Sequence, residues 1–237
     1  MPRAAAEATP QYWDDACRHL AKRDRVLKKL IPKFGEARLR SRGDAFTTLA
    51  RSIVGQQISV KAAQAVWDRF SGAVGGVPTQ LVPSDVLKLD LPALRESGLS
   101  ARKSEYLQDL ARHFDGGLVH VTQWEGMDDE AIIDELIAIR GIGRWTAEMF
   151  LIFHLMRPDV LPLDDLGLIK GISLNYFSGE PVSRVCLRPC ASACWWSNAP
   201  LELAVSLPRG AWSRGTERVC AVFVVSEPRG AQVSALN

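Results

Sequence analysis

Two adjacent carboxylates, Asp164 and Asp165, stand in an apolar stretch of the sequence, Leu161–Leu168. A carboxylate that is shielded from water can orient and deprotonate an attacking water molecule, and it can stabilise positive charge that develops on a substrate. A carboxylate directly before a helical pattern can instead cap that helix by accepting its first backbone N–H groups. The two interpretations are compatible, because one Asp can cap the helix while the other faces a cleft.

A second candidate segment is Gly141-Ile142-Gly143, which separates two stretches of helical periodicity. Glycine tolerates positive φ and leaves backbone N–H groups uncovered, because it has no Cβ. These donors would lie at the start of the following helix, where aligned amides and the helix dipole bind phosphate. Contacts of this kind fix a protein on DNA without reading its sequence. The alternative interpretation is an ordinary turn between two helices.

The elements that must position these residues are predicted to be helices. Apolar residues recur at helical spacing through most of the chain up to residue 182, and no strand pattern is convincing in that part. The segment Gly55–Ile58 interrupts one helical pattern, and Ser59 is expected to cap the next. The predicted fold class is therefore all-α. The expected helices cover 13–30, 45–54, 60–70, 84–89, 92–96, 101–114, 129–139 and 144–155, with a further short helix after Asp165.

Composition limits the class of protein. The chain has 237 residues, of which 47% are hydrophobic and 24% charged, as in folded globular proteins. No apolar run approaches the roughly 18 residues of a membrane span, and residues 1–11 lack the apolar core of a secretory signal. We therefore expect a cytoplasmic protein without membrane contact, with 1–11 as a disordered tail. The net charge of +2 argues against DNA binding by bulk electrostatics, so local geometry would have to provide it.

The last quarter of the chain differs in composition from the rest. From Gly171 onward there is no Lys and no Asp, and residues 183–237 hold four of the five Cys. One interpretation is a metal or iron–sulfur site, but the spacing of Cys186, Cys190 and Cys194 is usual for neither. A second is a genuine, poorly ordered tail, and a third is translation in a shifted reading frame. The abrupt gain of Cys, Arg, Pro and Trp favours the third interpretation.

Several separated motifs together resemble one protein family. They are Phe46–Ser59, Gly98–Ser100 with the basic pair that follows it, the glycine hairpin within 136–147, and Leu161–Leu168. Their types and order are similar to the helix-hairpin-helix superfamily of DNA glycosylases, in particular its bacterial 3-methyladenine DNA glycosylase II branch. The resemblance implies a two-lobed helical domain over residues 12–182. It leaves 183–237 as an incomplete or irregular C-terminal part.

The resemblance implies a hydrolytic reaction on double-stranded DNA, carried out by a monomer. Such enzymes flip the damaged nucleotide out of the duplex. The family fills the gap with a side chain from the turn after the first motif, which falls on Gln57, while Gln56 helps to shape the turn. The second Asp of the carboxylate pair is catalytic in the family, which falls on Asp165, and Asp164 is then expected to cap or support it. Trp145 stands where strand-cutting relatives place a Lys nucleophile, which implies a monofunctional hydrolase with water as the nucleophile.

An alkylated purine is the substrate that the resemblance implies. Such a base carries positive charge and its glycosidic bond is already weak, so the remaining task for Asp165 is to stabilise positive charge on the sugar. Aromatic walls attract a cationic base, and Trp145 is the candidate for this contact. Met149, one turn later on the same helix face, could line the same pocket. A packed position in the core is the alternative for Trp145.

The remaining expectations concern contacts to the DNA backbone and bound ions. Ser100 and Lys103 begin a predicted helix and are expected to contact a second phosphate, with a solvated helix start as the alternative. No metal is required for the chemistry, and hairpin carbonyls in the family can hold a monovalent cation. Two other functions stay open: a non-catalytic or inactive DNA-binding protein, and a glycosylase for a different damaged base. The expected DNA-binding residues are Gln56, Gln57, Ser100, Lys103, Gly141, Ile142, Gly143, Arg144 and Thr146.

Overall fold

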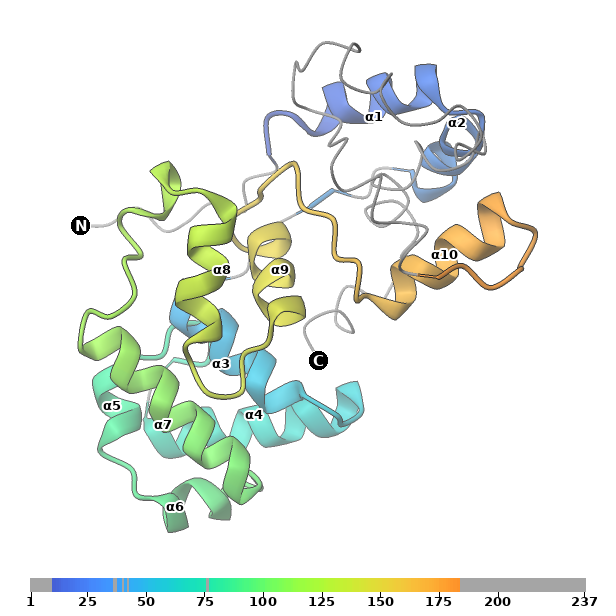
Figure 1. Ribbon diagram of the computed structural model, residues 1–237. Helices are drawn as coiled ribbons and strands as arrows, with labels where there is room; N and C mark the ends of the chain where they lie inside the picture. The colour runs from blue at the N-terminus through green and yellow to red at the C-terminus, as the bar shows by residue number, and fades with distance from the viewer. Residues whose placement is uncertain (1–9, 36–37, 40, 42, 76, 184–237) are drawn as a thin grey trace. The chain divides into compact units, whose positions relative to one another are not determined.

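The chain is helical wherever the computed structural model describes it, which is over residues 10–35, 38–39, 41, 43–75 and 77–183 (Figure 1). Within these residues the single strand-like pairing is an isolated bridge between Val77 and Gln80. The helices are α1 (Trp13–Arg23), α2 (Arg25–Leu30), η1 (Ile31–Phe34), α3 (Ala45–Gly55), α4 (Val60–Val74), α5 (Pro83–Leu87), α6 (Leu91–Glu96), α7 (Ala101–Asp115), η2 (Trp124–Gly126), α8 (Asp129–Ile137), α9 (Arg144–Phe153) and α10 (Leu166–Tyr176).

The described residues form two compact units, which confirms the prediction of an all-α, two-lobed chain. The larger unit comprises residues 41–155 and therefore α3 to α9. The smaller unit combines residues 10–39 with residues 156–183, so that α1, α2, η1 and α10 belong together. The atypical C-terminal segment, including its four Cys, and most of the expected N-terminal tail lie outside the described residues.

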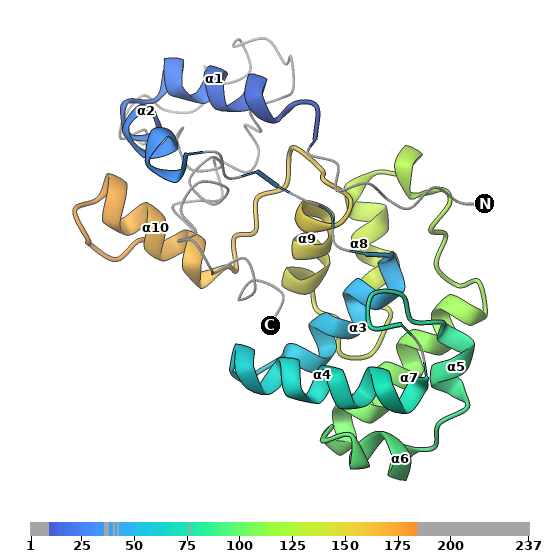
Figure 2. The ribbon, with the colours of Figure 1, turned by 180° about the vertical axis from the view of Figure 1, so that it is seen from behind.

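Helix α7 organises the larger unit. Helices α3, α5 and α6 all pack against it, and both ribbon views show the last two beside it (Figures 1 and 2). The core also contains a row of aromatic rings in edge contact, in which successive centroids are 5.3 to 6.4 Å apart. The rings in this row are Phe46, Phe114, Trp124 and Phe150. Because α7 contributes to this core along its length, it can hold loops that contact its exposed face.

The smaller unit corrects one predicted boundary. A single helix is expected over 13–30, but the chain breaks at Asp24, whose carboxylate accepts the N–H groups of Val26 and Leu27 and begins α2. Asp24 is only 2% exposed, and its other oxygen accepts a hydrogen bond from the hydroxyl of Tyr176 on α10 at 3.2 Å. A buried carboxylate with these partners is satisfied. The break therefore joins the two sequence segments of this unit.

Most helix starts in the described residues are capped by a side chain at the position that the sequence indicates. Examples are Asp44 before α3, Ser59 before α4 and Ser100 before α7. Apart from the helix that breaks at Asp24, the predicted helices are present with ends that shift by at most four residues; α4, for example, continues to Val74 and ends at Gly75 with a φ of 76°. Among the described residues, we find no helix with both the length and the apolarity of a membrane span.

Candidate nucleic-acid interface and carboxylate site

The glycine hairpin presents a helix start with free space around it. Gly143 is the N-cap residue of α9 and, having no side chain, it accepts no hydrogen bond from the first turn of this helix. Gly143 is exposed, and a Cβ built on it would meet nothing within 4 Å. The backbone N–H groups at the start of an uncapped helix favour an anion. This geometry is suited to a phosphate.

Helix α7 fixes the conformation of the hairpin. Gly141 has a φ of 89°, and a Cβ on it would lie 2.2 Å from Cδ2 of Tyr106, so the ring covers the glycine directly. The carboxylate of Asp109 accepts the backbone N–H of Arg140 at 2.9 Å. The side chain of Arg140 in turn donates to Glu105 at 3.0 Å. Three side chains on two successive turns of α7 thus hold the segment that leads into the hairpin.

The turn between α3 and α4 lies against the same hairpin. Gln56 ends α3, and its side-chain Nε2 donates to the carbonyl oxygen of Gly141 at 2.9 Å. Gln57 follows with a φ of 58°, a left-handed conformation that is uncommon for residues with a side chain. The side chains of Gln57 and Ile58 are exposed. The turn therefore presents Gln57 outward from a backbone that is tied to the hairpin.

Lys103 makes an intramolecular contact that the sequence did not indicate. Its Nζ donates to the carbonyl oxygens of Val54 and Gln56, both at 2.7 Å, so the ammonium lies at the C-terminal end of α3. Partial burial lowers the pKa of Lys103 from its ordinary value. Two hydrogen bonds of the ammonium are thus made within the protein, and the expected contact to a second phosphate stays a prediction. Ser100 caps α7 through the N–H of Lys103 at 3.3 Å.

Arg144 is also engaged within the protein. Its guanidinium donates to Glu130 on α8 through Nη1 at 2.9 Å, and to Glu148 on α9 through Nε at 3.0 Å. The hydrogen bonds to Glu130 are the main reason that the pKa of Arg144 is raised. A guanidinium held by two carboxylates is not a free cation for a phosphate. The predicted DNA contact of Arg144 stays a prediction, and Thr146, in the same first turn of α9, is buried.

The two predicted pocket residues differ in exposure. Trp145 is half-buried in the first turn of α9, which leaves part of its ring accessible. Met149, one turn later, is 0% exposed. A fully buried Met at this position favours a packing role over the expected role in lining a substrate pocket.

Asp165 is a buried carboxylate at the start of α10. It is 7% exposed, and its Oδ1 accepts the backbone N–H of Leu168 at 2.6 Å. The expectation that Asp164 provides the cap is wrong: Asp165 is the N-cap residue, and Asp164 is exposed. The N-terminal end of a helix favours negative charge on a neighbouring group. The position of Asp165 thus stabilises a carboxylate that is largely shielded from water.

Gly167 adds a steric feature to this site. A Cβ on Gly167 would lie 3.0 Å from Oδ1 of Asp165, a distance at which one of the two must give way. The carboxylate and its cap belong to the smaller unit, whereas the hairpin and the α3–α4 turn belong to the larger one. The predicted catalytic carboxylate and the residues of the hairpin and the α3–α4 turn therefore belong to two different units.

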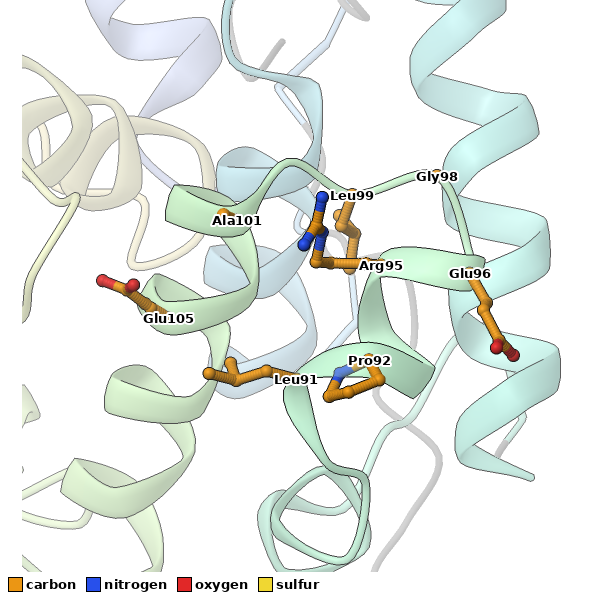
Figure 3. Close-up of a pocket in the computed structure, with 8 residues that line it drawn as sticks. All are labelled: Leu91, Pro92, Arg95, Glu96, Gly98, Leu99, Ala101 and Glu105. Atoms are coloured by element: carbon orange, nitrogen blue, oxygen red, sulfur yellow. The ribbon is translucent and has the colours of Figure 1, made fainter.

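A hollow of about 700 Å³ lies elsewhere in the larger unit, between α6 and the start of α7 (Figure 3). Its lining contains apolar side chains with one basic and two acidic residues, and the guanidinium of Arg95 points towards Leu99 and Ala101. None of the residues predicted to bind DNA or to act in catalysis lines this hollow. The residues that line it are Leu91, Pro92, Arg95, Glu96, Gly98, Leu99, Ala101 and Glu105.

Several residues at the interface were not found from the sequence. Tyr106 and Asp109 are separated from the hairpin by more than 30 residues, and their spacing on α7 is the ordinary spacing of one helix face. Glu148 was detectable, because a Glu four residues after an Arg on a helix is a common ion pair. Glu130 carried no such signal, since it lies on another helix.

Comparison with known proteins agrees with this arrangement. The profile of the HhH-GPD superfamily of base excision DNA repair proteins matches residues 50–184. DNA-3-methyladenine glycosylase 1 of Schizosaccharomyces pombe is 36% identical over 148 residues, which are 61% of this chain and 64% of that protein. Among solved structures, a DNA-3-methyladenine glycosidase from Bacillus halodurans aligns with a TM-score of 0.66 and 31% identity over 87% of this chain and 86% of that one.

A further similar structure is the 3-methyladenine DNA glycosylase of Schizosaccharomyces pombe in complex with abasic DNA. It aligns with a TM-score of 0.65 and 31% identity, covering 80% of this chain and 92% of the other. The chain belongs to the HhH-GPD superfamily of base excision DNA repair proteins. The predicted helix-hairpin-helix fold is thereby confirmed. The chain spans between about half and two thirds of the length of the curated relatives it matches.

Proposed function

We propose that this protein is a monofunctional DNA glycosylase that hydrolyses the N-glycosidic bond of alkylated purines in double-stranded DNA, acting as a monomer of the 3-methyladenine glycosylase II type. The observation that carries the proposal is the buried Asp165 carboxylate at the start of α10. Family membership supports it, as do the relatives that are named DNA-3-methyladenine glycosylase.

The proposed chemistry needs a negative charge that is held still and kept from bulk water. Departure of a cationic base leaves positive charge on the sugar, and a fixed carboxylate stabilises that charge as it develops. Asp165 meets this requirement because it is 7% exposed and the Leu168 N–H holds its Oδ1 in place at the start of α10, where a helix favours a negative group. The same carboxylate can orient a water molecule for attack on the sugar and accept its proton.

The proposed route to the substrate uses the larger unit. The start of α9 would bind a DNA phosphate. The exposed Gln57 side chain would fill the gap in the base stack from which the damaged nucleotide has been flipped out. Trp145, at the position of the Lys nucleophile in strand-cutting relatives, supports a single hydrolytic step with water. The half-buried ring of Trp145 is the proposed contact for a cationic base.

A monovalent cation at the hairpin is part of the proposal only as a structural element. The carbonyl oxygens of Leu136, Ile139 and Gly141 already accept hydrogen bonds from Ile139, Ile142 and Gln56, so such an ion would share these oxygens or use the remaining carbonyls of the hairpin. The ion would neutralise part of the phosphate charge next to the hairpin. The hydrolysis proposed for Asp165 uses water as the nucleophile and is not routed through it.

The test measures release of 3-methyladenine and 7-methylguanine from methylated duplex DNA by the purified chain, by Asp165→Asn and by Asp164→Asn. We expect release by the parent, a loss of at least about 100-fold in Asp165→Asn, and parental release in Asp164→Asn, which alters the exposed neighbour. Asn also caps helices well, so Asp165→Asn should remain folded. Parental activity in Asp165→Asn would contradict the proposed role.

The same assay separates the two alternatives. A folded parent that binds duplex DNA but releases no base would be a DNA-binding protein without catalysis. Release from duplexes with mismatched or oxidised bases, without release of methylated purines, would identify a glycosylase for a different lesion. Neutral lesions need more assistance from an acid, and among the described residues of the smaller unit the other buried carboxylate is Asp24 at the α1–α2 break, which caps α2.

A further inference from the structure

The contact between Lys103 and the α3–α4 turn has a specific geometric consequence. The carbonyl oxygen of Gln56 belongs to the peptide group that joins Gln56 to Gln57, and Lys103 Nζ donates to this oxygen at 2.7 Å. Rotation of that peptide group changes ψ of Gln56 and φ of Gln57 together. A hydrogen bond that fixes the carbonyl therefore fixes the left-handed φ of 58° at Gln57.

That conformation needs support from the surrounding structure. A residue with a Cβ in the left-handed region costs on the order of 1 kcal/mol, and such residues persist where neighbouring contacts hold them. Here one contact comes from Lys103, and the other comes from the Gln56 side chain, which donates to Gly141. The backbone carbonyl and the side chain of Gln56 are thus both fixed by hydrogen bonds, while the Gln57 side chain is exposed.

An ammonium group is well suited to this position. The last carbonyls of α3 have no partners within the helix, and the negative end of the helix dipole attracts a cation. Lys103 donates to two carbonyls there, Val54 and Gln56, and its partial burial reduces competition from water. Its own helix α7 also supports the hairpin through Tyr106 and Asp109. One helix therefore sets the turn and the hairpin relative to each other.

We infer that Lys103 is a positioning residue, which holds the peptide group before Gln57 so that the Gln57 side chain is presented for insertion into the DNA stack. The second half of this inference, the insertion of Gln57, rests on the proposed function. Its first half, the fixing of the turn, concerns the protein alone and can be measured without DNA. The two halves can therefore fail separately.

The first experiment compares the full-length parent with Lys103→Met and Lys103→Arg by NMR. Met keeps the apolar stem without donors, whereas Arg restores donors to the carbonyls. In the parent, a strong intraresidue HN–Hα NOE should mark the positive φ of Gln57. We expect Lys103→Met to lose this NOE and to show relaxation dispersion at residues 56–58, and Lys103→Arg to restore parental behaviour in part.

The matched control is Lys88→Met, which removes an exposed ammonium that binds Asp85 on α5. This control should leave the Gln57 signals unchanged. If Lys103→Met does not fold, Lys103→Gln, which keeps a donor but loses the charge and the reach, allows the same comparison. Parental NOE intensity and relaxation at Gln57 in a folded Lys103 variant would overturn the inference.

The second experiment measures insertion and phosphate binding separately. On duplexes with 2-aminopurine beside a lesion, Lys103→Met should reduce the fluorescence rise as Gln57→Ala does, and the double variant should show no further loss. The affinity for undamaged duplex and its salt dependence should stay parental. A salt slope lowered by about 1 would instead indicate a phosphate contact by Lys103 and overturn the positioning role.

Failure of the proposed function gives a different pattern. A parent that neither releases bases nor raises the fluorescence would refute the glycosylase proposal and the insertion step. The NMR comparison would still decide the structural half. An altered Gln57 in Lys103→Met would uphold the fixing of the turn, and an unaltered one would refute it.

Discussion

The side-chain Nε2 of Gln56 donates a hydrogen bond to the carbonyl oxygen of Gly141 at 2.9 Å, although the two residues are 85 positions apart in the sequence. This bond joins the turn that presents Gln57 to the hairpin that precedes α9. Both loops also contact the same face of α7, through Lys103 and Tyr106. Two loops that lie far apart in the chain are therefore in direct contact with each other and with one helix.

The two hairpin glycines should respond differently to substitution by Ala. At Gly141 the added Cβ would lie 2.2 Å from the Tyr106 ring and the backbone has a φ of 89°, so Gly141→Ala should lower the free energy of unfolding by about 1–3 kcal/mol. At Gly143 the Cβ meets nothing within 4 Å, so Gly143→Ala should change stability by less than about 0.5 kcal/mol. Urea denaturation of both variants checks this.

The same pair tests phosphate binding by the hairpin. A methyl group on Gly143 would lie beside the exposed amides at the start of α9, so Gly143→Ala should weaken binding to undamaged duplex DNA several-fold, on the order of 1 kcal/mol. Fluorescence anisotropy with a labelled duplex gives this value. Parental affinity in Gly143→Ala, combined with parental stability, would argue that phosphate does not bind here.

Substitutions of Asp165 should separate its structural role from its charge. Asp165→Ala removes the acceptor for Leu168 N–H and should destabilise the protein by about 1 kcal/mol, whereas Asp165→Asn keeps an acceptor and should cost less. The midpoint of chemical unfolding of the two variants decides the matter. If both variants lost the same stability, the charge rather than the cap bond would be the stabilising feature.

The helical class, the helix positions and the glycine hairpin were predictable because each depends on local chemistry. Periodicity, caps and glycines act over a few residues, and Asp44, Ser59 and Ser100 all cap helices as expected. The choice between Asp164 and Asp165 as the cap was not predictable. Both are good caps, and only the backbone path decides which one precedes the first helical residue.

The roles of the basic side chains were beyond the reach of sequence reasoning. Lys103 was expected at a phosphate because it begins a helix, but its partners are carbonyls about 50 residues earlier in the chain. Arg144 was expected at DNA because it follows the hairpin, but carboxylates on two helices hold its guanidinium. Glu148 was detectable as an ion pair within one helix, but the carbonyls that bind Lys103 and the carboxylate of Glu130 are brought there by packing, and a single sequence contains no sign of them.

His154 should make stability depend on pH. It stacks on Phe150 in the larger unit, and burial lowers the pKa of His154 from 6.5 to about 4, with the opposing influence of Asp44 being smaller. Because the unfolded chain takes up this proton first, the stability contributed by neutral His154 is complete above about pH 6.5 and is lost as the pH falls towards 4. The loss should reach about 2–3 kcal/mol at most.

The check is the unfolding free energy of the parent and of His154→Phe between pH 4 and pH 7. Phe keeps a ring on Phe150 and cannot be protonated, so its curve should be flatter over this range. The difference between the two curves isolates the contribution of His154 from that of the carboxylates, which titrate in both proteins. Parallel curves would show that His154 does not cause the pH dependence.

Removal of the acidic partner of Arg144 should strengthen DNA binding. The guanidinium of Arg144 now donates to Glu130, and this contact lowers the pKa of the Glu130 carboxyl. In Glu130→Gln, Glu148 is the remaining carboxylate that pairs with the Arg144 guanidinium. The substitution also removes the negative charge of Glu130, which repels DNA phosphates near the hairpin. We expect the affinity for undamaged duplex DNA to rise about two- to fivefold at low salt, with a steeper salt dependence.

The matched control is Asp134→Asn, which removes an exposed carboxylate from the same helix, α8. If the effect of Glu130→Gln came only from the change in net charge, Asp134→Asn would raise the affinity equally. If it comes from release of Arg144, the gain should disappear in the double variant Glu130→Gln/Arg144→Gln, whereas Asp134→Asn should have little effect. Salt titrations of all four proteins on one duplex distinguish these outcomes, since a freed guanidinium adds to the slope and a distant charge does not.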